Sequence, residues 1–175
     1  MSRLPYIDLD DAATELRELT RRGPVLNLYR VLPHAGPAGI GFLKLGGALL
    51  RENELDSRLR ELVILRVGVL CGSGYELHQH RRIARAIGVP DEKIAAIERG
   101  AESDAFDAWE KLVLQFTDAV VKDVKAPAPL FGAVAERLDH RRMSELVLTI
   151  GFYMLVSRYL ENFEVDIEQT EPSQR

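Results

Sequence analysis

The sequence contains a single cysteine, Cys71, and this excludes an intrachain disulfide. Its first residues, Met-Ser-Arg-Leu-Pro, lack the apolar stretch of a secretory signal peptide. The longest apolar run, residues 146–156, is much shorter than the about 20 residues that a membrane-spanning helix needs. These absences predict a cytoplasmic protein that does not associate with a membrane.

An excess of positive charge is also missing. The formal net charge is −4 and the isoelectric point is about 5.6, so there is no basic field to attract nucleic acid. The chain has 175 residues, 46% of them hydrophobic, which suffices for one buried core. We therefore expect one domain over residues 1–175 and no nucleic-acid partner.

No segment shows the sustained alternation of apolar and polar residues that marks a half-buried strand. Apolar residues instead recur at helical spacing between glycine and proline breaks, so we predict an all-α protein. The expected helices span residues 10–22, 26–32, 59–71, 74–88, 90–99, 107–123, 130–138 and 142–166. The glycine-rich segment 37–50 permits close packing but has modest helix propensity, and residues 34–37 are expected to form a loop.

Most of the titratable chemistry lies in residues 57–88, which we interpret as a central helical hairpin. Residues 59–71 are almost continuously apolar, a pattern typical of a helix buried on most of its circumference. The sequence Cys-Gly-Ser-Gly at residues 71–74 breaks this helix. Ser73 and Glu76 have the spacing of a capping box for a second helix, and Gly88 is a natural residue to end it.

The hairpin geometry brings distant residues together. Glu61 lies about as far before the turn as His80 lies after it, so their axial offset in an antiparallel pair is only about 7 Å. Glu76 is four residues before His80 and shares its helix face, whereas His78 is rotated by roughly 200° and points elsewhere. Glu61, Glu76 and His80 are therefore candidate catalytic residues.

These residues carry a resemblance to a known family. The segment Arg-Glu-Leu-Val-Ile-Leu-Arg-Val at residues 60–67, followed by Gly-Ser-Gly-Tyr-Glu-Leu-His-Gln-His at residues 72–80, resembles the carboxymuconolactone decarboxylase and alkylhydroperoxidase D superfamily. Glu61 matches the family glutamate and His80 the family histidine. The Cys-x-x-Cys pair of the peroxidase branch falls on Ser73 and Glu76, so the dithiol is absent. The segment Tyr-Glu-Leu at residues 75–77 is similar to the Tyr-Glu-Trp of members without the second cysteine.

The resemblance implies an alkylhydroperoxidase D-like multi-helical bundle, an enzyme acting on a small molecule, and a homo-oligomer. The apolar surface expected over residues 146–159 also favours self-association. No cofactor is implied. We expect no metal site either, because the imidazoles of the His-x-His pair diverge on a helix and zinc needs three or four convergent ligands.

Each candidate also has a purely structural interpretation. Glu61 has basic neighbours with which it can form ion pairs, and His80 can make ordinary hydrogen bonds. A capping box alone explains Ser73 and Glu76, whereas the resemblance makes Ser73 a substrate-binding candidate. Tyr75 either donates its hydroxyl to the site or packs in the core. Cys71 is either a small buried apolar residue or a thiol activated by its surroundings.

Three functions compete at this stage. In the first, which suits the missing dithiol, a lyase resembling carboxymuconolactone decarboxylase uses Glu61 and His80 as a cofactor-free acid/base pair on a small carboxylated or lactone-like substrate. In the second, a peroxidase of the alkylhydroperoxidase kind, an oxidoreductase, uses Cys71 together with an external thiol. In the third, an oligomeric scaffold has kept the fold and lost the chemistry.

Overall fold

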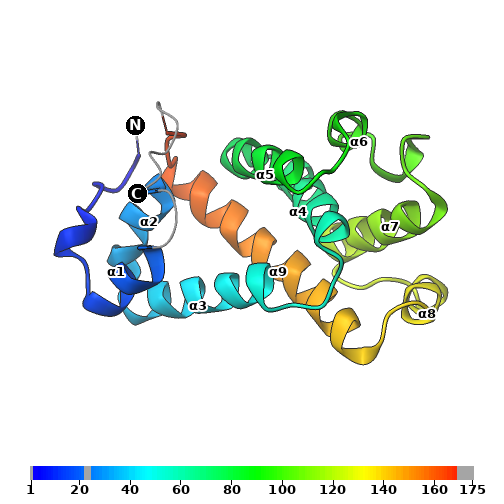
Figure 1. Cartoon of the computed structure of the whole chain (residues 1–175), viewed down its shortest axis with the longest axis horizontal. Coiled ribbons are helices and arrows are strands. Elements are labelled where there is room, and N and C mark those ends of the chain that lie inside the picture. The colour runs from blue at the N-terminus through cyan, green and yellow to red at the C-terminus, as the bar shows by residue number, and fades with distance from the viewer. Residues whose placement is uncertain (1, 22–24, 169–175) are drawn as a thin grey trace. The chain divides into compact units, whose positions relative to one another are not determined.

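The computed structural model describes residues 2–21 and 25–168, and every regular element within these ranges is helical (Figure 1). The all-α prediction is confirmed. The α-helices are α1 (Thr14–Thr20), α2 (Asn27–Val31), α3 (Pro37–Arg51), α4 (Ser57–Cys71), α5 (Gly74–Ala86), α6 (Asp91–Ala96), α7 (Ala108–Asp123), α8 (Ala128–Ala135) and α9 (His140–Phe163). Short 3-10 helices span Leu9–Asp11, Leu32–Ala35 and Gly100–Glu102.

The helices occur where the sequence predicts them, with two corrections. The expected loop at residues 34–37 is wrong, because Leu32–Ala35 forms a 3-10 helix and Pro37 opens α3. Proline suits that position since its missing N–H has no partner in the first turn of a helix. The first predicted helix is shorter than expected and begins at Thr14. Its predicted end at residue 22 and the following Gly-Pro stop lie outside the described residues.

The chain forms two compact units, one made of residues up to Glu52 together with those from Tyr159 onward, and the other of Asn53–Arg158. Helix α9 runs through the boundary between them. We call them unit 1 and unit 2. The expectation of one domain over the whole chain stays a prediction.

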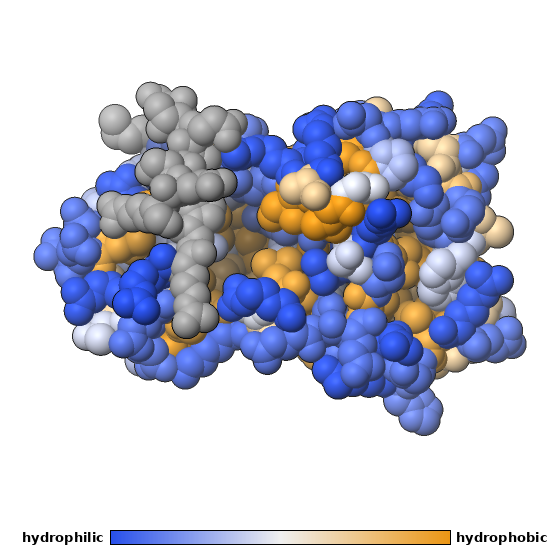
Figure 2. All heavy atoms as spheres, viewed as in Figure 1, coloured by the Kyte–Doolittle hydropathy of each residue, from blue (hydrophilic) through white to orange (hydrophobic). Residues whose placement is uncertain are grey.

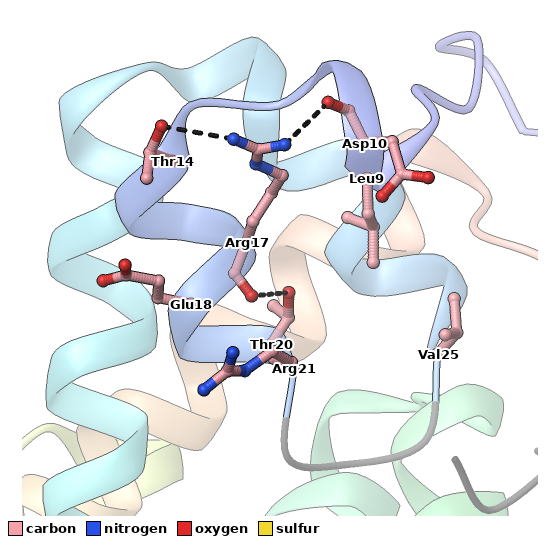
Figure 3. Close-up of a pocket in the computed structure, with 8 residues that line it drawn as sticks. All are labelled: Leu9, Asp10, Thr14, Arg17, Glu18, Thr20, Arg21 and Val25. Atoms are coloured by element: carbon pink, nitrogen blue, oxygen red, sulfur yellow. Dashed lines mark hydrogen bonds between the residues drawn. The ribbon is translucent and has the colours of Figure 1, made fainter.

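In unit 1 the buried side chains of Leu16, Val31 and Leu32 form the centre of the packing. A hollow of about 540 Å³ opens beside α1 (Figure 3). The guanidinium of Arg17 is held there by the carbonyl of Asp10 and the hydroxyl of Thr14. None of the lining residues belongs to the catalytic candidates of the sequence.

Unit 2 is built around α4, in which every residue from Leu59 to Gly68 is buried. The carboxylate of Asp56 caps this helix by accepting the amide of Leu59 at 2.9 Å. Apolar side chains of α4 pack with those of α5, α6 and α7 into one core cluster, which includes Leu62, Leu65, Ala84, Val89, Ile94, Ala96, Ile97, Phe106 and Leu114. The prediction of a buried core helix is confirmed.

The turn between α4 and α5 is a Schellman motif, in which two backbone bonds close the end of a helix. The amide of Ser73 donates to the carbonyl of Gly68 at 2.9 Å, and the amide of Gly72 donates to that of Val69 at 3.1 Å. Gly72 adopts the required left-handed conformation, with φ of 67°. The chain therefore reverses sharply, and α5 packs directly against α4.

The predicted capping box is wrong. Ser73 is the N-cap residue of α5, but its side chain makes no capping hydrogen bond. Its hydroxyl is buried without a hydrogen-bond partner among the described residues. The carboxylate of Glu76 lies next to His80 instead. The spacing identified the start of the helix correctly, but both side chains are directed into the protein.

The absence of a side chain at Gly68 allows α4 and α5 to approach closely. A Cβ atom there would lie 3.2 Å from Cδ2 of Leu77 and 3.7 Å from Cβ of Glu76. The first distance is shorter than an ordinary van der Waals contact, so the side chain of Leu77 would have to shift by a few tenths of an ångström to admit a larger residue. Gly68 and Glu61 are two helical turns apart and share the face of α4 that α5 covers.

No helix in the described part of the chain is long and apolar enough to cross a membrane. The hydropathy view shows a largely hydrophilic surface, with apolar patches of which one lies over the α4–α5 hairpin (Figure 2). On α9, Val147, Leu148 and Leu155 are 40%, 51% and 53% exposed. The expectation that this helix supports a homo-oligomer stays a prediction.

Arg66 links α4 to the rest of unit 2 through a bidentate ion pair. Its Nε and Nη2 donate to the carboxylate of Asp118 in α7 at 2.6 and 2.7 Å. Its Nη1 donates to the carbonyls of Ile97 and Glu98 at 3.0 and 2.8 Å. The side chain of Arg66 is only 8% exposed, so these hydrogen bonds are made by a buried, charged donor.

We predict that Arg66→Ala lowers the free energy of unfolding by about 3 kcal/mol, because it removes the buried donor to the carboxylate of Asp118 and to two backbone carbonyls. Lys122 contacts the same carboxylate at 2.8 Å but is 54% exposed, so Lys122→Ala is the matched control, with an expected loss below about 1 kcal/mol. Urea denaturation measures both. Equal losses in the two variants would contradict the assignment of Arg66 as the anchor.

Candidate active site

The carboxylate of Glu61 and the imidazole of His80 meet inside unit 2. Oε2 of Glu61 lies 2.7 Å from Nδ1 of His80, and the two residues are 0% and 5% exposed. The hairpin places them at the same level, as the antiparallel geometry predicts. We call this pair the Glu61–His80 dyad. Its catalytic role stays a prediction.

A second carboxylate lies on the other side of the imidazole. Oε2 of Glu76 is 3.5 Å from Nε2 of His80 and lies one helical turn before it on α5. His80 is therefore held between two carboxylates, one near each ring nitrogen. His78 is exposed, as expected from its rotation on the helix. The hairpin thus brings together Glu61 of α4 with Glu76 and His80 of α5, as predicted.

Burial and charge favour protonation of this cluster. Burial alone lowers the pKa of His80, but the hydrogen bond and charge of Glu61, with the charge of Glu76, outweigh it and hold that pKa above its ordinary value. Burial raises the pKa of Glu76, which the charge of His80 opposes and the charge of Glu61 reinforces. Both shifts favour an imidazolium at His80 and a neutral carboxyl group at Glu76.

Arg60 adds a positive charge beside the dyad. Its Nε lies 3.6 Å from Oε1 of Glu61, and its Nη1 donates to the side chain of Asn53 at 3.3 Å. The structural interpretation of Glu61 as an ion-pair partner is thus correct in part, although this contact is longer than the one to His80. Arg58 donates instead to the carbonyl of Ile87.

Tyr153 is a neighbour of the dyad that the sequence analysis did not find. Its ring meets the imidazole of His80 edge-on, with centroids 4.9 Å apart and an interplanar angle of 89°. The residue comes from α9, more than seventy positions further along the chain. An aromatic residue inside a long apolar stretch carries no sign of such a role, because only the packing of α9 against α5 creates the contact.

The remaining candidates are less directly connected. Cys71, at the end of α4, is half-buried, and its Sγ lies 3.7 Å from Nη1 of Arg158. Ser73 and Tyr75 are buried at the start of α5. No cluster of three or more metal-ligating side chains is found among residues 2–21 and 25–168. The roles of Cys71, Ser73 and Tyr75 stay predictions.

A match to a known family covers the helices that carry the dyad. Residues 38–119 match the model of the Carboxymuconolactone decarboxylase family. This segment, just under half of the chain, is similar to the carboxymuconolactone decarboxylase family. The resemblance of the hairpin motif is thereby confirmed. A match to this family leaves the reaction open.

Known relatives are distant in sequence and close in fold. "Uncharacterized protein YdfG" of Bacillus subtilis (strain 168) is 24% identical over 103 residues, 58% of this chain and 70% of that protein. The alkylhydroperoxidase AhpD core of an uncharacterized peroxidase-related protein from Ralstonia eutropha JMP134 has a TM-score of 0.84 at 17% identity, covering 96% of this chain and 93% of that one. The debrominase Bmp8, in complex with 2,3,4-tribromopyrrole, has a TM-score of 0.80 at 17% identity, covering 97% and 95%. These structures establish the fold.

We predict that Glu76→Gln stabilises the protein relative to the wild type increasingly as the pH rises from 4.5, the ordinary pKa of this carboxyl group, to about 6. In this window the unfolded wild type releases the Glu76 proton that the folded state retains, so the wild type loses stability, whereas glutamine carries no such proton. His80 stays protonated in both states because the window lies below its ordinary pKa of 6.5.

Melting temperatures measured across this range test the prediction. The exposed carboxylate of Glu102 provides the control, since Glu102→Gln should show no such trend. A melting-temperature difference between Glu76→Gln and the wild type that is constant with pH would show that Glu76 is ionised in the folded protein.

Proposed function

We propose that this protein is a cofactor-free acid/base enzyme that decarboxylates, or transfers a proton on, a small carboxylated or lactone-like substrate. The observation that carries the proposal is the buried 2.7 Å contact between His80 and Glu61, with Glu76 near the opposite ring nitrogen. Such an arrangement fixes the ring and its tautomer and places one exchangeable proton at Nε2. The similarity of residues 38–119 to the carboxymuconolactone decarboxylase family supports it.

In this mechanism Glu61 accepts the Nδ1–H of His80 and stabilises the imidazolium. When the bond from the substrate α-carbon to its carboxyl group breaks, CO₂ leaves and the electron pair stays on the α-carbon as an enolate. The Nε2–H of His80 then protonates this carbon. Glu76, favoured in its neutral form, returns a proton to Nε2 and is reprotonated from solvent, so each turnover consumes one proton.

The same three side chains can also catalyse a proton transfer within a lactone, without loss of CO₂. His80, once deprotonated at Nε2, removes a proton from the carbon next to the carbonyl group and delivers it to another carbon of the same enolate. Arg60 lies close enough to the dyad to offset the negative charge that develops on the enolate oxygen. In the debrominase relative the fold accommodates a small planar ring, which is consistent with a substrate of that size here.

We predict that Glu61→Gln and His80→Ala each reduce turnover by a factor of about 10² to 10⁴, the usual contribution of a positioned acid or base. The assay is a screen of purified protein against small lactones and carboxylic acids, following CO₂ release and deuterium incorporation. His78→Ala is the matched control because His78 lies on the same helix but is exposed. Equal activity in all three variants would refute the dyad as the catalytic pair.

Peroxidase chemistry is the second candidate, and the guanidinium of Arg158 beside the Cys71 thiol favours it. A Cys71 thiolate would attack a hydroperoxide to form a sulfenic acid and release an alcohol, and an external thiol would then reduce the sulfenic acid in two steps. The peroxidase-related fold neighbour is consistent with this chemistry. Among the described residues, however, Cys71 has no hydrogen bond to either member of the dyad.

We predict that Cys71 forms no stoichiometric sulfenic acid with hydrogen peroxide or an organic hydroperoxide, and that Cys71→Ser retains the acid/base activity. Intact-mass measurement with a dimedone-type trap follows the thiol directly. Rapid trapping that is abolished by Cys71→Ser and slowed by His80→Ala would instead establish the peroxidase function and displace the acid/base proposal.

A further inference from the structure

Buried polar atoms without a hydrogen-bond partner are concentrated on the hairpin that carries the dyad and on α9. Within the described residues they are Nε of Arg60, Oε1 of Glu61, Oγ of Ser73, Oε2 of Glu76, Oγ1 of Thr149 and Oγ of Ser157. All belong to α4, α5, the N-cap of α5 or α9. Buried polar groups in folded proteins are nearly always paired, so a concentration of unpaired ones points to a missing ligand.

The hydroxyl groups of Thr149 and Ser157 are unusual for helical residues of this protein. Thr20, Thr117 and Ser144 each donate their hydroxyl to the carbonyl four residues earlier, at 3.1, 2.8 and 2.8 Å. Thr149 and Ser157 make no such bond, although they are 0% and 1% exposed. Their hydroxyls therefore remain available to a group that does not belong to the helix.

Thr149 and Ser157 lie on the same face of α9 as Tyr153. Thr149, Tyr153 and Ser157 are spaced four residues apart, so they share one face of the helix. Tyr153 contacts the His80 ring directly. Thr149 and Ser157 thus flank this contact, each about 6 Å along the helix axis from Tyr153.

Contacts at both ends fix the register of α9 against α4. At one end the amide of Glu54 donates to Glu145 and its carbonyl accepts from Arg142, pairs that are 91 and 88 residues apart in sequence. At the other end Arg158 contacts Cys71, a pair 87 residues apart. The two segments therefore run parallel, as Figure 1 shows.

This register places each hydroxyl at a particular level of the hairpin. The contacts between the two segments join residues that are 87 to 91 positions apart. Applied to Glu61, this offset gives residues 148–152 of α9, so Thr149 lies at the level of the dyad. By the same offset Ser157 lies beside the last turn of α4. Ser73 is at that level too, because its amide bonds to the carbonyl of Gly68.

Ser73 and Ser157 lie at the same level as the N-terminal end of α5. This helix has 13 residues and no side-chain cap, so its first turn presents the positive end of the helix dipole. Two buried, unpaired hydroxyls at such an end are suited to an anion such as a carboxylate. At the other level, the hydroxyl of Thr149 beside Glu61 and His80 is suited to a neutral carbonyl oxygen.

We propose that α9 binds the substrate of the Glu61–His80 dyad through two hydroxyls, Thr149 holding a carbonyl or lactone oxygen at the dyad and Ser157, together with Ser73, holding a carboxylate at the start of α5. The inference rests on the proposed function for the reaction, and it defines the substrate as a short oxo-acid or lactone acid. About 12 Å of helix separates the two hydroxyl residues. If each hydroxyl makes a hydrogen bond of about 3 Å to the substrate, about 6 Å of this distance remains between the two oxygen-bearing groups of the substrate. A chain of four or five carbons has this span.

The experiment measures binding rather than turnover, with 4-oxopentanoate as the probe that carries both groups. Pentanoate lacks the ketone, and pentan-2-one lacks the carboxylate. The ring nitrogens of His80, observed by NMR in uniformly ¹⁵N-labelled full-length protein, report the titration of each compound. Thr149→Val and Ser157→Ala are the two variants, and Ser144→Ala, an exposed residue of the same helix, is the control.

Thr149→Val should weaken 4-oxopentanoate about tenfold and leave pentanoate unchanged, since one hydrogen bond to the ketone is lost. Ser157→Ala should weaken both acids by a similar factor and leave pentan-2-one unchanged. Equal weakening of all three compounds by either variant would overturn the assignment of the two ends. Failure of 4-oxopentanoate to bind the wild type would overturn the inference as a whole.

Thermal unfolding separates ligand binding from a structural role. Because neither hydroxyl has a partner in the folded protein, Thr149→Val and Ser157→Ala should melt at or above the temperature of the wild type. Thr117→Val, which loses a bond to the carbonyl of Val113, should melt below it. A lowered melting temperature in the two α9 variants would show that their hydroxyls serve the fold, and would overturn the inference.

The outcomes also distinguish the inference from the proposed function. The predicted binding pattern without any turnover in the lactone and acid screen would retain the α9 site and reject the acid/base reaction. Turnover that depends on Glu61 and His80, with KM unchanged in both α9 variants, would retain the reaction and reject the α9 site.

Discussion

The hydrogen bond between Glu61 and His80 is the interaction on which the rest of unit 2 depends. A carboxylate with no solvent exposure is expensive to desolvate, and its imidazole partner compensates for this only while the two remain in contact. The Schellman turn at Gly72 and the close approach at Gly68 both serve that contact. The architecture of the hairpin is therefore also the architecture of the site.

The second buried ion pair of α4 connects the helix to its other neighbours in unit 2. Arg66 connects the helix to α7 and to the carbonyls that follow α6, one and a half turns from Glu61 on α4. Charged residues interrupt an otherwise apolar helix at both places, and each has a dedicated partner. Glu61 and Arg66 are charged positions within the apolar run of α4. Their ion pairs fix the position of α4 relative to α5 and α7, which apolar contacts alone specify less strictly.

The hairpin and the dyad were predictable from the sequence because both depend on local geometry. A turn at Gly72 and a fixed rise per residue bring Glu61 level with His80 without further information. The contribution of α9 was not predictable in this way. Tyr153 reaches His80 only through the register of two helices, and that register is set by contacts of Glu54 and Arg158 that no spacing in the sequence reveals.

The capping box failed for a related reason. A Ser and a Glu at the right separation identify the start of α5, but the motif is silent about what else the side chains can reach. In the folded protein the carboxylate of Glu76 lies beside the buried imidazole of His80, and the hydroxyl of Ser73 is buried in the interior of unit 2. A departure from a local rule is therefore itself informative, because it occurs on the helix that carries His80.

Gly68 gives the hairpin an unusual kind of control over its chemistry. The separation of α4 and α5 is set at a position with no side chain, two turns from the proton that the dyad holds. Proton transfer between heteroatoms depends steeply on their distance, and a methyl group introduced there would leave this distance unchanged only if the side chain of Leu77 gave way by a few tenths of an ångström. A residue that bears no functional group thereby contributes to the separation of the two helices that carry the carboxylate and the imidazole.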